Sequence, residues 1–399
     1  MEKSNETTTH VQEPTWPELL GSNNWDGLLD PLDLSLRRFI LRCGDFCQCT
    51  YDSFNDDKDS DYAGSCRYGK KSLFRKVKFE FAAEYQVHSF LYATATFGVY
   101  TGPWDSETNF IGYIATSTDA MSQLLGRREI YVVWRGTQTT YEWINVAYFN
   151  PVSVETLLRH GEKSEAKVMN GWLNLYTSKN PNSAFMKHSA REQLQKKIYQ
   201  LIREDYSNEN VSIVLTGHSL GAALAVLSAF DLVENGFDDI PVSAVVFGCP
   251  RVGDLRFTER LQQHTNLKIL HTKNKLDLIT LYPLDMPGMD YSDAGILLEI
   301  DCRKSPYLRL IPKDIPGDWH NLQGILHVVA GWHGSQQEFQ LAVKRSPALV
   351  NKSCDFLKDE YKIPASWWVV ENKGMLLNRE GDWVLPPPPD EDRPVPEFQ

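Results

Sequence analysis

The stretch VSIVLTGHSLGAAL, residues 211–224, decides the fold. Its β-branched first part, residues 211–215, predicts a buried strand, and its alanine-rich part predicts a helix that runs on toward Leu232. A turn of the form Gly-x-Ser-x-Gly joins them, made of Gly217, His218, Ser219, Leu220 and Gly221. Strand, turn and helix in this order are typical of a nucleophile elbow.

The two glycines of the turn are the physical basis of this interpretation. Because Gly217 and Gly221 lack side chains, a sharp turn can pass close to the strand and the helix that it joins. Ser219 would then project its hydroxyl above the sheet, and the amide of Leu220, at the helix N-terminus, would stabilise an oxyanion. The alternative is an ordinary junction with a chance Gly-x-Ser-x-Gly, but the flanking strand and apolar helix favour the elbow.

Other apolar runs predict the rest of a sheet. Residues 128–134, 242–247 and 267–271 have the composition of buried strands, and aromatic runs within residues 89–115 predict one or two peripheral strands. Strands that alternate with helices imply a mainly parallel sheet with helices on both faces. The predicted fold class is therefore α/β, with the reactive residues on loops at the carboxyl ends of the strands.

Two of the helices can be predicted in more detail. Residues 32–43 carry apolar side chains at helical spacing, and such a helix would pack on the back of the main sheet. Ser189 and Glu192 form a capping box, and the apolar stripe behind it reaches Tyr206.

A second loop at the sheet has the composition of an oxyanion loop. Arg135, Gly136 and Thr137 follow the strand of residues 128–134 at once. A glycine at this point lets the backbone approach a reacting carbonyl and offer an amide. The alternative is a plain turn at a strand end.

The segment after this loop, about residues 138–160, is too apolar for an ordinary surface loop. It is either buried or a mobile lid with an apolar face for an aggregated substrate, and its position beside the oxyanion loop favours the lid. The lid or acyl-binding candidates are Tyr141, Trp143, Ile144 and Phe149.

The ends of the chain differ in composition from the middle. Residues 1–14 are predicted to be disordered, residues 15–385 to form a single domain, and the proline-rich acidic tail, residues 386–399, to be extended and disordered. The amino terminus lacks the apolar core of a signal peptide, and no apolar run is long enough to span a membrane.

The net charge and the cysteines limit the expected binding partners and the expected compartment. A net charge of −11 argues against nucleic acid and against nonspecific binding to anionic lipid. The seven scattered cysteines are typical of reduced thiols in a cytoplasmic protein. No metal site is predicted, because Cys47 and Cys49 are too closely spaced for a zinc knuckle.

A serine nucleophile needs a base and an orienting acid. After Ser219 the histidines are His264, His271, His320, His327 and His333. We expect His264 and His271 to be structural, the first on a predicted helix and the second near a strand end before most acid candidates. In the loop after the strand of residues 267–271, Asp277 is the first choice for the acid. The alternatives are Asp254, Asp285 and Asp290.

Several blocks in order resemble one family. The blocks WRGT, GHSLGAALA, FGCPRVGD, NKLDLITLYP and HNLQGILHVVAGWHG are similar to those of the class 3 lipase superfamily, and within it to the plant class II phospholipases A1. The resemblance runs from about residue 16 to residue 383. It implies an α/β-hydrolase fold with a lid over the active site.

The resemblance also implies roles for single residues. The family's acid lies in an N-x-x-D element followed by proline, matched by Asn274, Asp277 and Pro283, and its base is matched by His320. His327 would be a packing residue on a helix. The family's oxyanion donors are matched by Thr137 and Leu220.

This chain departs from close relatives after the acid. They usually have Val-Pro there, whereas Leu278, Ile279 and Thr280 follow Asp277 here. Between residues 287 and 316 lies an extra stretch to which the sequence assigns no element.

The activity that the resemblance implies is hydrolysis of the sn-1 ester of a glycerophospholipid at a membrane or micelle interface, giving a 2-acyl lysophospholipid and a fatty acid. No cofactor and no obligate protein partner are expected. The alternatives are a general lipase, galactolipase or carboxylesterase with the same triad, or a lipase-like signalling scaffold without turnover.

Overall fold

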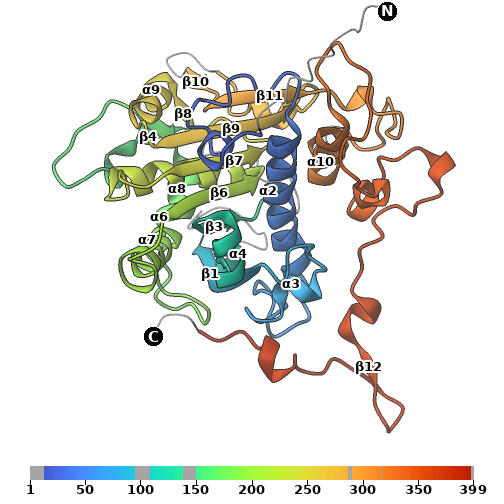
Figure 1. The fold of residues 1–399 in the computed structure, drawn as a ribbon. Coiled ribbons are helices and arrows are strands. Elements are labelled where there is room, and N and C mark those ends of the chain that lie inside the picture. Colours follow the sequence, from blue (N-terminus) through green and yellow to red (C-terminus); the bar gives the residue numbers. More distant parts are fainter. Residues whose placement is uncertain (1–12, 95–107, 138–149, 286–289, 316, 397–399) are drawn as a thin grey trace, which may run out of the picture.

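A seven-stranded sheet forms the centre of the computed structural model, which describes residues 13–94, 108–137, 150–285, 290–315 and 317–396 (Figure 1). Five neighbouring strands run parallel to one another, and the two strands at one edge are joined to them by antiparallel pairing. In spatial order the strands are β1 (Tyr85–Thr94), β2 (Thr108–Ser117), β3 (Arg128–Trp134), β6 (Val211–His218), β7 (Val242–Phe247), β9 (Leu267–Asn274) and β11 (Ile296–Ile300).

Both faces of this sheet are buried, as the strand sequences require. Along β6, Ile213 and Leu215 belong to one apolar core and Val214 to the other, because successive side chains of a strand point to opposite faces. Helices α6 (Asn170–Thr177), α7 (Ala190–Gln200) and α8 (Leu220–Glu234) cover one face, and α2 (Leu34–Ser53) and α10 (Leu322–Gly331) cover the other (Figure 1). The predicted α/β fold with a mainly parallel sheet and helices on both faces is confirmed.

Short elements complete the domain. A small sheet has the order β10, β8, β5, β4, and β12 pairs with β13 in a hairpin. The helices and strands among them are α1 (Trp16–Leu19), α3 (Leu73–Lys76), α4 (Asp119–Leu125), α9 (Leu255–Gln263), β4 (Pro151–Ser153), β5 (Lys167–Met169), β8 (Gly253–Asp254), β10 (Tyr291–Ser292), β12 (Leu376–Leu377) and β13 (Trp383–Val384). The short 3₁₀ helices are η1 (Val154–Leu157), η3 (Leu278–Leu281), η4 (Cys302–Lys304), η5 (Asp318–His320), η6 (Pro347–Lys352), η7 (Asp359–Tyr361), η8 (Glu371–Gly374) and η9 (Asp390–Asp392), and the π-helix η2 (Leu201–Asp205) follows α7 directly. In the described part of the chain, no helix combines the length and the hydrophobicity needed to cross a bilayer.

Two elements are longer than the ranges predicted for them from the sequence. Strand β6 continues from Leu215 to His218, because its last residues still pair with β3 and β7 on either side. Helix α2 continues ten residues beyond the apolar stripe that predicts it, and it ends at Ser53. The predicted capping box of α7 is confirmed, since Ser189 Oγ accepts from the Glu192 amide at 3.2 Å and Glu192 Oε2 accepts from the Ser189 amide at 3.1 Å.

The predicted lid range is only partly described. Its candidates Tyr141, Trp143, Ile144 and Phe149 lie outside the described residues. The carboxyl end of the range differs from the prediction: β4 pairs with β5, and in η1 Val154 and Leu157 are fully buried. This part belongs to the core, because its apolar side chains pack under the small sheet.

The carboxyl-terminal tail also differs from the prediction of disorder. Asp392 is buried, and its carboxylate accepts from the Gly69 amide at 2.7 Å and from Ser72 Oγ at 2.5 Å. Lys76 on α3 lies 3.7 Å from the same carboxylate. A composition rule treats an acidic residue as solvated and cannot foresee donors so distant in the chain.

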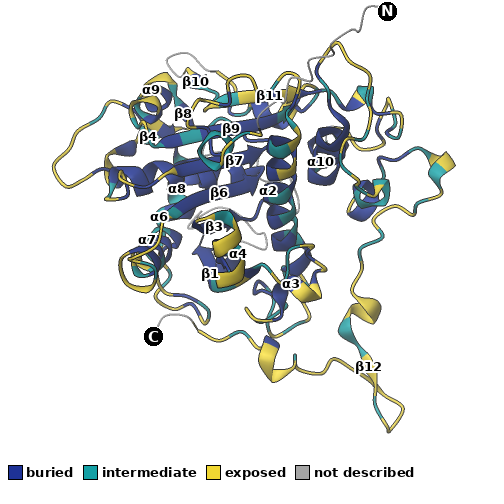
Figure 2. Cartoon of the chain, viewed as in Figure 1, coloured by how far each residue is buried: buried dark blue, intermediate teal, exposed yellow. Residues whose placement is uncertain are grey.

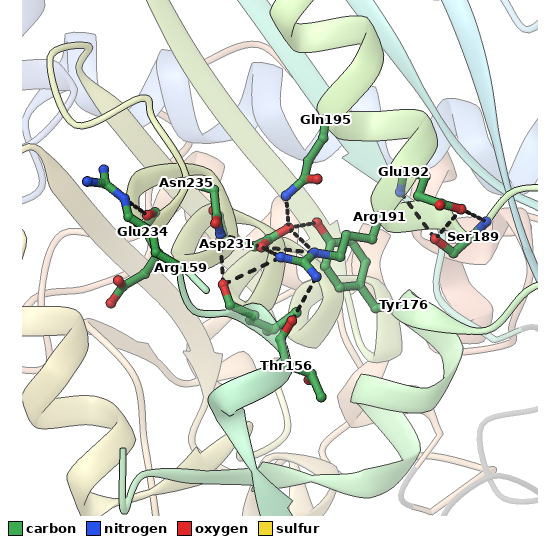
Figure 3. A network of polar contacts seen from close by, with 11 residues as sticks. Thr156, Arg159, Tyr176, Ser189, Arg191, Glu192, Gln195, Asp231, Glu234 and Asn235 are labelled. Carbon is green, nitrogen blue, oxygen red and sulfur yellow. Dashed lines mark hydrogen bonds and ion pairs between the residues drawn. The ribbon is translucent and has the colours of Figure 1, made fainter. Parts of the chain in front are cut away.

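A buried acid ties the helices of one face together (Figure 3). Asp231 on α8 is inaccessible to solvent and accepts hydrogen bonds from Arg191, Tyr176, Gln195 and Asn235, at 2.8 to 3.1 Å. These donors come from α6, α7 and the end of α8, so one carboxylate fixes how the three helices pack.

Replacing Asp231 by alanine is expected to lower the free energy of unfolding by about 3 kcal/mol or more, because the Arg191 guanidinium and Tyr176 hydroxyl lose their buried partner. Urea unfolding followed by circular dichroism would measure it. Asp239→Ala is the control, because Asp239 forms an exposed ion pair with Arg203 that should contribute less than about 1 kcal/mol. Equal effects of the two substitutions would contradict the assignment.

Candidate active site

The turn after β6 has the strained backbone of a nucleophile elbow. Ser219 has φ +59° and ψ −127°, a region that residues with side chains rarely adopt. A Cβ on Gly217 would lie 2.1 Å from the carbonyl oxygen of Gly221, and a Cβ on Gly221 would lie 2.4 Å from that of Trp134. Both positions therefore need glycine, as the sequence predicts.

The loop after β3 lies against this elbow. A Cβ on Gly136 would lie 2.5 Å from the carbonyl oxygen of His218 and 3.3 Å from Ser219 Cβ. Thr137, the next residue, is buried. Leu220 begins α8, where backbone amides have no acceptor within the helix. The structure thus brings together the two loops that the sequence assigns to an oxyanion hole.

The predicted acid and base form a buried pair. His320 Nδ1 lies 2.6 Å from Asp277 Oδ2, and both side chains are almost inaccessible to solvent. A Cβ on Gly248 would lie 2.9 Å from His320 Cε1 and 3.1 Å from Asp277 Oδ2, so only glycine leaves room for the pair. His320 Nε2 is buried and has no hydrogen-bond partner among the described residues, so its lone pair is available to accept a proton.

In the loop that carries the acid, Ile279 stands where close relatives have the proline of Val-Pro, and its backbone amide is used. Asp277 caps η3, and its Oδ1 accepts from the Ile279 amide at 2.9 Å, a bond that proline at position 279 would remove. Thr280 Oγ1 donates to the Asp277 carbonyl at 2.8 Å. Asn274 holds the residue before the base, since its Nδ2 donates to the Trp319 carbonyl at 2.8 Å.

Two of the alternative acids are engaged elsewhere. Asp254 caps α9 by accepting from the Phe257 amide at 2.9 Å. Asp285 lies 2.8 Å from Arg251. Asp290 is exposed.

The turn histidine has a partner that the sequence analysis missed. His218 Nε2 lies 2.7 Å from the His320 carbonyl oxygen, and His218 Nδ1 lies 2.7 Å from Tyr51 Oη. Because a carbonyl only accepts, Nε2 must carry the proton, and Tyr51 donates to Nδ1. Burial lowers the pKa of His218 well below its usual range, and the neighbouring His320 lowers it further, so the ring stays neutral.

The two hydrogen bonds of His218, to Tyr51 and to the backbone carbonyl of His320, position the base. Tyr51 lies on α2, 167 residues before His218, so no local pattern pairs them. Gly248 was also overlooked, although a glycine at the end of a predicted strand is a signal of close approach.

Replacing Tyr51 by phenylalanine is expected to lower kcat/KM for an ester substrate about tenfold, since the His218 tautomer is no longer held and the bond to the His320 carbonyl weakens. Initial rates of ester hydrolysis by Tyr51→Phe over a range of pH would test this, with unfolding curves to check that the variant is folded. Tyr206→Phe removes a hydroxyl that contacts Thr116 away from the site and is the matched control. Wild-type rates in Tyr51→Phe would contradict the positioning role.

The other histidines have structural partners. His271 Nε2 accepts from the Cys249 amide at 2.9 Å, His327 Nε2 lies 2.8 Å from Ser305 Oγ, and His264 Nε2 lies 3.0 Å from Glu234 Oε1. Burial lowers the pKa of His271 and of His327 to about 4 each.

The lowered pKa values of His271 and His327 predict that acid destabilises the fold. Below its ordinary pKa of about 6.5 each histidine takes up a proton when the chain unfolds, whereas the folded form binds it only near pH 4; stability is therefore lost as pH falls through this window. The loss should be on the order of 2 kcal/mol per residue between pH 7 and pH 4. In His327→Gln, the free energy of unfolding measured with urea should fall by that much less between pH 7 and pH 4 than in the wild type. In His160→Gln, which changes an exposed histidine, it should fall as much as in the wild type. Equal losses in both variants would contradict the assignment.

A cavity of about 690 Å³ opens beside the pair. Thr137, His218 and His320 line it on the catalytic side, and Lys352 and Trp368 line it from the carboxyl-terminal segment. Lys352 Nζ lies 4.3 Å from the Trp368 ring centre and pairs with Asp52. The cavity therefore reaches His320 and the loop of Thr137, whereas Ser219 is not among its lining residues.

The chain is similar to several known proteins. A triacylglycerol lipase from Penicillium expansum is similar over 67% of this chain and 80% of its own, with 15% identity and a TM-score of 0.45. The family described as Lipase (class 3) matches residues 131–286. Phospholipase A1-IIdelta of Arabidopsis thaliana is 52% identical over 96% of this chain and 98% of its own length, and Phospholipase A1-II 5 of Oryza sativa subsp. indica is 48% identical over 96% and 84%. With relatives this similar along almost its whole length, the chain is a serine hydrolase that belongs to the phospholipase A1-II group of the class 3 lipases.

Proposed function

We propose that this chain hydrolyses the sn-1 ester of glycerophospholipids through Ser219, His320 and Asp277. The observation that carries the proposal is the buried His320–Asp277 pair, 2.6 Å apart, beside a serine in a strained elbow. The phospholipid class follows the names of the two plant relatives, both called phospholipases A1.

The proposed reaction has two halves. Ser219 Oγ attacks the ester carbonyl while His320 Nε2 takes the hydroxyl proton, and Asp277 orients the imidazole and stabilises its charged form. The amides of Leu220 and Thr137 bind the oxyanion of the tetrahedral intermediate. The C–O bond to glycerol then breaks, and the lysophospholipid alcohol leaves with the proton from His320.

Deacylation repeats these steps with water. His320 takes a proton from water, the hydroxide attacks the acyl-serine, and the fatty acid leaves as Ser219 recovers its proton. None of these steps requires a metal or an organic cofactor. Tyr141, Trp143, Ile144 and Phe149 remain candidates for the lid and acyl contacts. The proposed compartment is the cytoplasm, where the seven free thiols would stay reduced.

The test is hydrolysis of a phosphatidylcholine with different acyl chains at sn-1 and sn-2, with the released acid identified by mass spectrometry. Release of the sn-1 chain, absent in Ser219→Ala, is expected. Release of the sn-2 chain would overturn the regiochemistry. Turnover of short soluble esters alone would favour a carboxylesterase. Turnover of galactolipid or monoacylglycerol but not of phospholipid would favour a galactolipase or general lipase, and turnover of none of these substrates would favour a scaffold.

A further inference from the structure

The segment after the cavity wall exposes apolar side chains that a folded core would bury. None of residues 369–391 is buried. Exposed fractions there are 75% for Val369, 58% for Trp383 and 57% for Leu377. Such a density of exposed hydrophobic groups marks an interaction surface. Its members are Val369, Val370, Leu376, Leu377, Trp383, Val384 and Leu385.

Most of these side chains lie on the hairpin of β12 and β13. Leu376 pairs with Val384 and Leu377 with Trp383, and Asn378 closes the turn by bonds with Asp382. Figure 2 shows the hairpin standing away from the rest of the chain, with most of it coloured as exposed. An isolated two-stranded hairpin gains little stability from its own contacts, so its apolar side chains are free for another surface.

The hairpin is nevertheless held at both ends. Trp368 donates its amide to the Lys352 carbonyl at 3.1 Å, and its ring lies under the Lys352 ammonium. At the other end the Asp392 carboxylate is bonded to Gly69 and Ser72. The fold therefore presents the hairpin from a defined position.

The segment before the hairpin adjoins the cavity. Trp368 and Val370 line the cavity and lead directly into the hairpin. Asp314 lines the same cavity from another loop, and the residues around it are exposed: Leu310, Ile311 and Ile315, at 65%, 78% and 51%. Apolar side chains thus flank the cavity on two segments.

We infer that the hairpin of residues 376–385 docks this chain on a zwitterionic lipid surface and feeds lipid to the cavity. This inference rests on the proposed function, because a lipid substrate must leave an aggregate to reach His320. Tryptophan beside leucine and valine suits the boundary between head groups and acyl chains. The net charge of −11 disfavours anionic lipid, and the hairpin region is nearly balanced, with Glu371, Lys373, Arg379, Glu380 and Asp382.

The experiment uses the full chain and the variant Leu377→Ser/Trp383→Ser. Binding to phosphatidylcholine vesicles is measured by co-sedimentation in a Ser219→Ala background, so that the lipid is not consumed. Turnover of the same vesicles and of a short soluble ester is measured with Ser219 intact. Leu124→Ser is the matched control, since Leu124 is 84% exposed on α4, before β3 and so at the opposite end of that strand from Gly136.

The double variant should bind vesicles and hydrolyse their lipid about tenfold less well, with an unchanged rate on the soluble ester. Leu124→Ser should match the wild type in all three assays. The inference would be overturned if the double variant bound vesicles as well as the wild type, or if its rate on the soluble ester fell as much as its rate on vesicles. It would also be overturned if the wild type were a dimer that the double variant abolishes. Wild-type protein that binds vesicles but hydrolyses no phospholipid would instead refute the proposed function and leave the docking surface standing.

Discussion

Replacing Ser219 by alanine is expected to lower kcat for phospholipid hydrolysis by a factor of about 10⁶, leaving only the residual catalysis that the oxyanion hole and substrate binding supply. Without the hydroxyl no acyl-enzyme can form, and the His320–Asp277 pair has no proton to take from the protein. Released fatty acid, measured over hours at high enzyme concentration, gives the residual rate.

The matched control for this prediction is Ser353→Ala. Ser353 lines the cavity that His320 also lines, so its loss tests whether another serine near the base matters. Its rate should stay within about twofold of the wild type. A Ser219→Ala enzyme that kept a tenth of wild-type activity would show that another group is the nucleophile.

Replacing Asp277 by asparagine should lower kcat by about 10⁴, the second-largest effect expected. An amide in place of the carboxylate can donate to His320 Nδ1, which favours the imidazole tautomer that cannot accept the serine proton, and it does not stabilise the imidazolium. The bond from the Ile279 amide to the other side-chain oxygen can persist, so the loop should keep its shape.

Asp285→Asn is the control for this substitution, since Asp285 lies a few residues on and pairs with Arg251 rather than with a histidine. We expect near-wild-type activity from it. Similar losses in the two variants would mean that Asp277 contributes through loop stability, and the acid of the mechanism would have to be sought elsewhere.

The elbow and the central sheet could be predicted because their signals are local. The run of residues 211–224 contains its own strand, glycines and helix, and the parallel pairing of β3, β6 and β7 follows from their apolar composition. The loop position made Asp277 the first choice for the acid, but selecting His320 needed the family resemblance, because nothing in the spacing of an acid and a histidine 43 residues apart implies a 2.6 Å contact.

Features that depend on long-range contacts escaped the sequence analysis. Tyr51 meets His218 only because α2 packs across the end of β6, and Asp392 meets Ser72 across 320 residues. Strand β11 lies in the stretch left without an assignment, since ILLEI is short and half exposed, and pairing with β9 makes it a strand. In each case the partner, and not the residue's own neighbourhood, decides the structure.

The most direct test of the triad is covalent labelling of the folded enzyme with a fluorophosphonate, followed by peptide mapping. We expect one equivalent of label per chain, on Ser219, with much slower labelling of Asp277→Asn and no labelling of the unfolded chain. Label on a different residue, or labelling of Asp277→Asn at the wild-type rate, would contradict a serine activated by His320 and Asp277.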